Sequence, residues 1–148
     1  MDLKRIASGI QGLDDILLGG LLAGRVYLIE GMSGTGKTIL ANQVCFHHVQ
    51  SGNRAVFMTL LAEGHGHMLE NLSTLDFYDE AKVADTLHYI SAYQVLEQNG
   101  LEALIQFIAG AKKKFDATLL VIDGFSICRE FAKSDIEYIR FVHKLCTL

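Results

Sequence analysis

A glycine-rich segment carries the pattern G-x-x-x-x-G-K-[ST], running from Gly31 to Thr38. Glycines let a backbone wrap closely around phosphate groups and point its N–H groups inward. In this pattern the lysine reaches the β- and γ-phosphates, and the hydroxyl of the last residue is placed to ligate Mg²⁺. We therefore expect ATP and Mg²⁺ to bind here. The expected nucleotide contacts are Gly31, Met32, Ser33, Gly34, Thr35, Gly36, Lys37, Thr38 and Ile39.

The residues on either side of this loop have the types that the motif requires. Residues 26–30 form a β-branched and aromatic run that predicts a short buried strand. Residues 37–50 place apolar side chains at helical spacing and end at Ser51, Gly52 and Asn53, which predicts a helix and its stop. A strand, a glycine-rich turn and a helix are thus expected in that order, with Lys37 on the phosphates.

A second candidate is Asp123, which follows the apolar run at residues 119–122. A carboxylate at the end of such a strand holds the Mg²⁺ shell in phosphate-loop proteins, so Thr38 and Asp123 are the expected metal ligands. The alternative is an ordinary turn, because the Asp-Gly pair at 123–124 also favours one.

A third candidate is Glu63, just past a strand predicted at residues 55–61. Hydrolysis needs a carboxylate near the γ-phosphate to orient the attacking water, and ligands of open α/β sheets bind at the carboxyl ends of strands. A solvated loop glutamate is the alternative. His65 and His67 have a spacing that zinc can use, but no further ligands complete a set. They could instead contact phosphate or a neighbouring subunit.

The elements that must position these residues alternate along the chain. Further strands are expected at 86–91 and 118–122, with helices around 68–75, at 101–115 and from Ser134 onward. Alternation of buried strands and helices predicts an α/β fold in which helices cover both faces of a parallel sheet. At 148 residues the chain has the length of one domain, so a single domain over residues 1–148 is expected.

Composition narrows the classes of function. Half of the residues are hydrophobic and a fifth are charged, which is typical of a globular protein. A net charge of −4 argues against nucleic acid as a partner, and the basic run at 112–114 is expected to end a helix. The longest apolar runs are too short to span a membrane, so a cytoplasmic location is expected. The three cysteines are interpreted as reduced core thiols.

Read together, the motifs resemble those of the KaiC-like ATPases of the RecA superfamily. The lead-in at residues 5–25 is similar to that family's S/T-G-I-x-G-L-D pattern, followed by its spaced glycines, and the resemblance extends over residues 5–131. It implies a P-loop NTPase with a RecA-like parallel sheet sandwiched by helices. It also implies that Glu63 is the second of the family's two water-activating glutamates, while Ala62 stands in place of the first.

The resemblance carries expectations about assembly and completeness. Intact relatives form rings, commonly hexamers, in which hydrolysis drives signalling or autophosphorylation. Their cores continue past the strand that ends in the metal-binding aspartate, and the next strand inserts beside it. We therefore expect this chain to be the N-terminal portion of such a domain, with the C-terminal part of the core missing, or to be completed by a partner.

The motifs predict Mg²⁺-dependent ATP binding and ATP hydrolysis, with Glu63 and Lys37 as catalytic residues, and the resemblance implies that the ATPase is regulatory or acts in signalling. The alternative is a nucleotide-dependent interaction module that does not hydrolyse ATP and acts on a signalling partner. A small-molecule kinase would need an arginine-rich lid, but the second half has only Arg129 and Arg140. DNA strand exchange would need basic, aromatic-rich loops.

Overall fold

The computed structural model describes residues 4–62 and 64–148. A three-stranded parallel sheet lies at its centre, in the order β4-β3-β5. The strands are β3 (Ala55–Thr59), β4 (Leu87–Ser91) and β5 (Leu119–Asp123). The register aligns Thr59 with both Ser91 and Asp123, so all three strands end at the same edge of the sheet.

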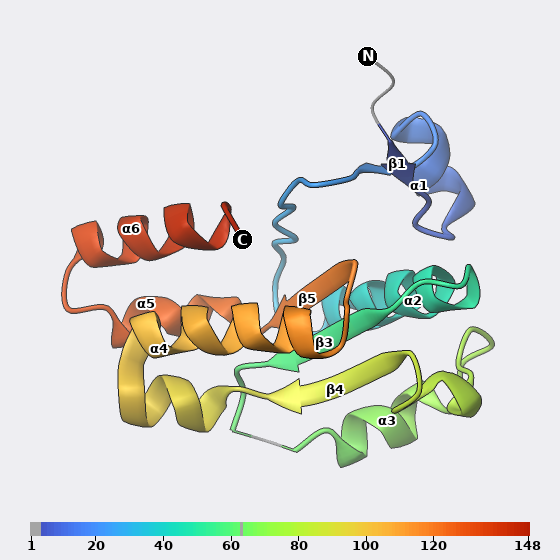
Figure 1. Ribbon diagram of the computed structural model, residues 1–148. Coiled ribbons are helices and arrows are strands. Elements are labelled where there is room, and N and C mark those ends of the chain that lie inside the picture. Colours follow the sequence, from blue (N-terminus) through green and yellow to red (C-terminus); the bar gives the residue numbers. More distant parts are fainter. Residues whose placement is uncertain (1–3, 63) are drawn as a thin grey trace.

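Helices cover both faces of this sheet, as the sequence predicts (Figure 1). One face packs against α4 (Tyr93–Lys114), α5 (Cys128–Phe131) and α6 (Asp135–Leu145). The other packs against α2 (Lys37–Gln50) and residues that follow α3 (Gly66–Leu72). Two short 3₁₀ turns, Glu80–Lys82 and Phe125–Ile127, complete the connections. The α/β fold class is confirmed.

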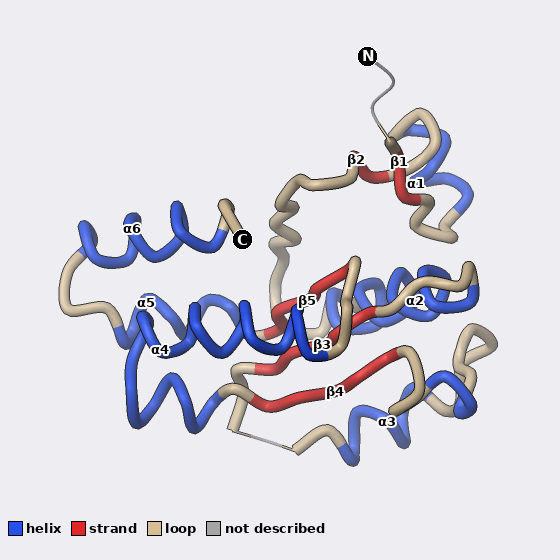
Figure 2. Tube along the Cα trace, in the orientation of Figure 1, coloured by secondary structure: helices blue, strands red, loops and turns tan. Residues whose placement is uncertain are grey.

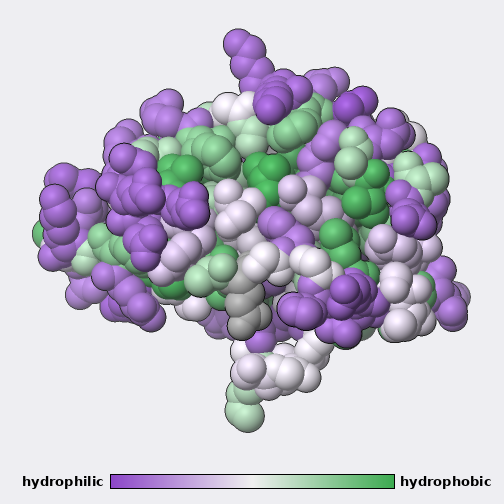
Figure 3. All heavy atoms as spheres, turned by 90° about the horizontal axis from the view of Figure 1, so that it is seen from below, coloured by the Kyte–Doolittle hydropathy of each residue, from purple (hydrophilic) through white to green (hydrophobic). Residues whose placement is uncertain are grey.

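Strand β3 is the central element of the core, and all five of its residues are buried. Val56 and Met58 face the α4 side, while Ala55 and Phe57 face the α2 side. Because side chains alternate along a strand, one continuous apolar strand supplies both layers of the core. The surface seen from below in Figure 3 shows apolar patches set between hydrophilic ones, as expected for a globular unit.

The predicted bounds of α2 and the predicted start of α6 agree with the structure, whereas α3 ends at Leu72, before its predicted end at residue 75. Helix α2 spans Lys37–Gln50 and is followed by Gly52 in the left-handed region at φ +85°. Helix α6 begins after Ser134, whose hydroxyl accepts a hydrogen bond from the Glu137 N–H. Helix α4 begins earlier than predicted, at Tyr93, and is interrupted at Gly100, where φ is +78°. Its last turn carries the expected lysines.

The strand predicted at residues 26–30 is not present, and this expectation was wrong. Residues 25–32 have no regular secondary structure, and the tube in Figure 2 shows them as a loop. Val26 and Leu28 are 61% and 69% exposed. A strand needs a hydrogen-bonded neighbour, and the described sheet ends at β5 on that side. The local apolar pattern was present, but no described strand pairs with it.

The lead-in forms a small unit of its own before this loop. Strands β1 (Arg5–Ile6) and β2 (Leu21–Leu22) pair antiparallel around α1 (Gln11–Ile16). Asp14 accepts hydrogen bonds from the Ser8 and Gly9 N–H groups. A Cβ atom on Gly9 would lie 2.4 Å from Cγ of His47, so the lead-in contacts α2 where only glycine fits.

The cysteine prediction is correct in part. Cys45 and Cys128 are buried, and burial raises the pKa of each thiol to about 12. Cys146 is exposed, so its assignment to the core was wrong. It is the first residue past α6, where an apolar neighbourhood in sequence does not require burial in space.

Candidate nucleotide-binding site

The phosphate loop lies directly before α2, as the motif requires. Gly34 and Gly36 adopt the left-handed conformation at φ +79° and +88°, which favours glycine. Cβ atoms at these two positions would meet open space, so the loop leaves room beside them. Gly31 has a different constraint, because a Cβ there would lie 2.9 Å from the Thr35 hydroxyl.

The first turn of α2 is suited to an anion. Gly36 is its N-cap, no described side chain caps the turn, and its first turn holds no acidic residue. The unpaired N–H groups and the positive end of the helix dipole therefore face the loop. A helix N-terminus of this kind beside a glycine-rich loop is a phosphate-binding arrangement.

Lys37 supplies a mobile positive charge to the loop. Its ammonium group donates hydrogen bonds to the carbonyl oxygens of Gly31 at 2.8 Å and Met32 at 2.7 Å. These contacts are exposed, and an exposed lysine on a flexible stem can be transferred to a stronger acceptor at small cost. Phosphate oxygens would be such acceptors. Met32 and Ile39, also predicted to contact nucleotide, are exposed beside the loop.

The two predicted metal ligands meet in the structure. The Thr38 hydroxyl donates a hydrogen bond of 2.8 Å to Oδ2 of Asp123. The Asp123 backbone carbonyl accepts the Leu60 N–H, and its Oδ1 accepts the Gly124 N–H, so the carboxylate is held at the end of β5. A hydroxyl and a carboxylate are hard oxygen donors of the kind that Mg²⁺ prefers, and the donor set fits that ion.

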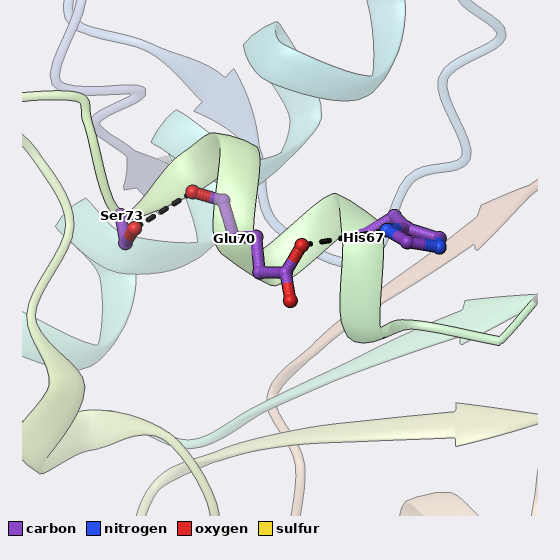
Figure 4. Close-up of polar contacts among 3 residues, drawn as sticks. All are labelled: His67, Glu70 and Ser73. Atoms are coloured by element: carbon purple, nitrogen blue, oxygen red, sulfur yellow. Dashed lines mark hydrogen bonds and ion pairs between the residues drawn. The ribbon is translucent and has the colours of Figure 1, made fainter.

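The predicted catalytic carboxylate, Glu63, lies outside the described residues. Two positions later in the sequence, the His65 ring packs against Tyr89 with centroids 5.8 Å apart, and burial lowers the pKa of His65. The His67 side chain is exposed on α3, where its Nδ1 lies 3.4 Å from Oε2 of Glu70 (Figure 4). Within residues 4–62 and 64–148, no group of three metal-ligating side chains gathers, so the zinc alternative gains no support.

Sequence reasoning missed Asn42, a buried polar residue behind the loop, and its half-buried partner Tyr89. Asn42 is fully buried in α2, where its amide contacts the Thr38 carbonyl and the Tyr89 hydroxyl. The available signal was a polar residue within the apolar stripe of a predicted helix. Its partner on β4 could not be read from that pattern.

These features define a class. A glycine-rich loop directly before a helix, with a Ser/Thr hydroxyl meeting an aspartate at the end of a parallel strand, is the arrangement of a P-loop NTPase.

Comparison with known proteins identifies the family. Residues 6–146 match the family described as "ATPase: KaiC". The chain is 32% identical over 128 residues to the circadian clock oscillator protein KaiC of Picosynechococcus sp., covering 82% of this chain and 25% of that protein. It is 30% identical over 146 residues to the protein of the same name from Prochlorococcus marinus, covering 94% of this chain and 29% of the relative. The chain belongs to the KaiC ATPase family of the RecA superfamily.

The chain spans about a quarter of the length of these curated relatives. Within the part that the structure describes, no helix is both long and apolar enough to cross a membrane.

Proposed function

We propose that this chain binds ATP with Mg²⁺ on the loop at residues 31–38 and hydrolyses it. The observation that carries the proposal is the Thr38–Asp123 contact, which brings both predicted metal ligands to one place beside an uncapped helix N-terminus. The nucleotide contacts are the loop residues predicted from the motif. Residues 1–148 would form one nucleotide-binding domain.

Each residue has a distinct role in this proposal. Lys37 moves from the loop carbonyls to the β- and γ-phosphates, where its charge meets theirs. Thr38 and Asp123 hold Mg²⁺, which when bound would draw charge from the phosphate oxygens. Glu63 orients and polarises the attacking water. The strand register supports the proposal that residues following β3 act next to Asp123, because β3 and β5 end side by side at Thr59 and Asp123.

We also propose a regulatory role and ring assembly for this chain, and its membership of the family supports both. The relatives bear the name of a circadian clock oscillator protein, and we propose signalling rather than metabolism for this chain. Homo-oligomeric rings of the kind expected for intact relatives would place ATP near a neighbouring subunit. A protein partner in signalling and autokinase activity belong to the same proposal. The net charge of −4 argues against nucleic acid as a partner.

A second candidate function is a nucleotide-dependent interaction module that does not complete hydrolysis. Two observations favour it. Val26, Leu28 and Ile29 are exposed in a segment that pairs with no described strand. Such an apolar segment is suited to contact another polypeptide. The replacement of the family's first glutamate by Ala62 points in the same direction.

Phosphate release from Mg·ATP separates the two functions. The wild type and Glu63→Gln should bind ATP equally, whereas hydrolysis by the variant should fall by about 10²- to 10⁴-fold. ATP binding by the wild type with no phosphate release above that of the variant would leave the interaction module as the function.

A further inference from the structure

Asn42 is a buried polar residue in α2, whose other buried side chains are apolar except for His48. Its side chain is 0% exposed, and its Nδ2 donates a 2.8 Å hydrogen bond to the Thr38 carbonyl oxygen. That carbonyl already accepts a helical N–H bond in α2. The extra hydrogen bond from the Asn42 amide is therefore not needed to form the helix. It instead restrains the first turn of α2 from its buried side.

The amide of Asn42 is itself held from the sheet. The Tyr89 hydroxyl, in the middle of β4, donates a 2.7 Å hydrogen bond to Oδ1 of Asn42. The orientation is unambiguous because the Thr38 carbonyl can only accept and therefore faces the NH₂ group. Burial raises the pKa of Tyr89, so its hydroxyl stays protonated and remains a donor.

These bonds connect the sheet to a predicted metal ligand. Tyr89 holds Asn42, Asn42 holds the Thr38 backbone, and the Thr38 hydroxyl meets Asp123. We infer that Asn42 and Tyr89 are positioning residues, which hold the Thr38 hydroxyl where it can ligate Mg²⁺ beside Asp123. The inference rests on the proposed function, since it assigns the residues that support its metal site.

The same tyrosine also contacts the segment that follows β3. Its ring packs on Phe57 with centroids 5.4 Å apart and on His65 at 5.8 Å. Tyr89 thus touches both the helix that begins at the phosphate loop and the residue two positions after Glu63. A phenylalanine would keep these ring contacts and remove only the hydrogen bond to Asn42.

The test uses ATP affinity measured by calorimetry across a range of Mg²⁺ concentrations and in EDTA. Tyr89→Phe should raise the half-saturating Mg²⁺ concentration about two- to tenfold, the effect of losing one hydrogen bond. Its ATP affinity in EDTA should equal that of the wild type. The matched control is Tyr78→Phe, because Tyr78 also packs on α2, through the Phe46 ring at 5.3 Å.

A double variant separates positioning from stability. Asn42→Leu with Tyr89→Phe replaces both partners by apolar groups of similar shape, which restores stability when the role is structural. The inference expects this variant to unfold at about the wild-type temperature and still to need more Mg²⁺. A wild-type Mg²⁺ dependence in both Tyr89→Phe and the double variant would overturn the inference and leave the proposed function standing. ATP binding by the wild type that is indifferent to Mg²⁺ would overturn both.

Discussion

The Thr38 hydroxyl donates a 2.8 Å hydrogen bond to Oδ2 of Asp123, 85 positions later in the chain. One residue lies in the first turn of α2, and the other ends β5. Each was a candidate metal ligand for a separate reason in the sequence, and the fold brings them together. Parallel strands that end at one edge, with a helix beginning beside them, place such residues at a common point.

Asp123→Asn should weaken Mg²⁺ binding and leave the phosphate loop at residues 31–38 intact. Asparagine keeps the shape of the side chain and an oxygen that can accept the Thr38 hydrogen bond, but it loses the negative charge. We expect the Mg²⁺ concentration for half-maximal ATP binding to rise at least about tenfold. Calorimetry with ATP over a series of Mg²⁺ concentrations measures this. Equal Mg²⁺ dependence in variant and wild type would remove Asp123 from the metal site.

Much of the fold follows from local pattern. Helix α2 and strands β3, β4 and β5 lie within two residues of their predicted ends, because each is a continuous apolar segment with a clear stop. Residues 26–30 show the limit of that reasoning. Their pattern is typical of a strand, but a strand also needs a neighbour, and sequence pattern alone does not show whether one is present.

The parts of the site that belong to a sequence motif could be predicted, whereas the contacts that depend on how β4 is aligned with α2 could not. Loop residues 31–38 and Asp123 could be named from the sequence. The Asn42–Tyr89 bond joins residues 47 positions apart, and it depends on which residue of β4 faces α2. No local spacing encodes that pairing. The Glu63 assignment stays a prediction, since that residue lies outside the described part of the chain.

Gly124→Ala should destabilise the protein. Gly124 follows Asp123 at φ +79°, and a Cβ there would lie 2.8 Å from Cδ2 of Leu61. The left-handed conformation alone costs an L-residue about 1–2 kcal/mol. We expect the free energy of unfolding, measured in urea, to fall by at least about 1 kcal/mol. Gly110→Ala is the control, because Gly110 is helical with open space around it and should be neutral or stabilising.

Stability should fall as the solution is acidified below neutral pH. Burial lowers the pKa of His48, whose Nε2 lies 2.8 Å from the Thr118 hydroxyl, and also lowers those of His65 and His88. The unfolded chain then binds more protons than the folded one at acidic pH. The stability that these histidines contribute is present above about pH 6.5 and is lost as pH falls through their lowered folded-state pKa values.

Urea unfolding at a series of pH values from neutral to mildly acidic measures this dependence. His48→Gln removes one of the three histidines, so the free energy of unfolding should fall less steeply as the pH is lowered. The slope matters here, not the absolute stability of the variant. An unchanged or steeper slope in His48→Gln would contradict the assignment of that proton uptake to His48.

The most direct test of the central claim is calorimetric titration of Mg·ATP into the wild type and Lys37→Ala. The ammonium group makes charge-assisted hydrogen bonds to phosphate in the proposed complex, so its removal should weaken binding at least about tenfold. Lys113→Ala, in the last turn of α4, is the control and should bind as the wild type does. Saturable wild-type binding that Lys37→Ala loses would support a working phosphate loop, whereas no binding, or equal binding by both proteins, would contradict it.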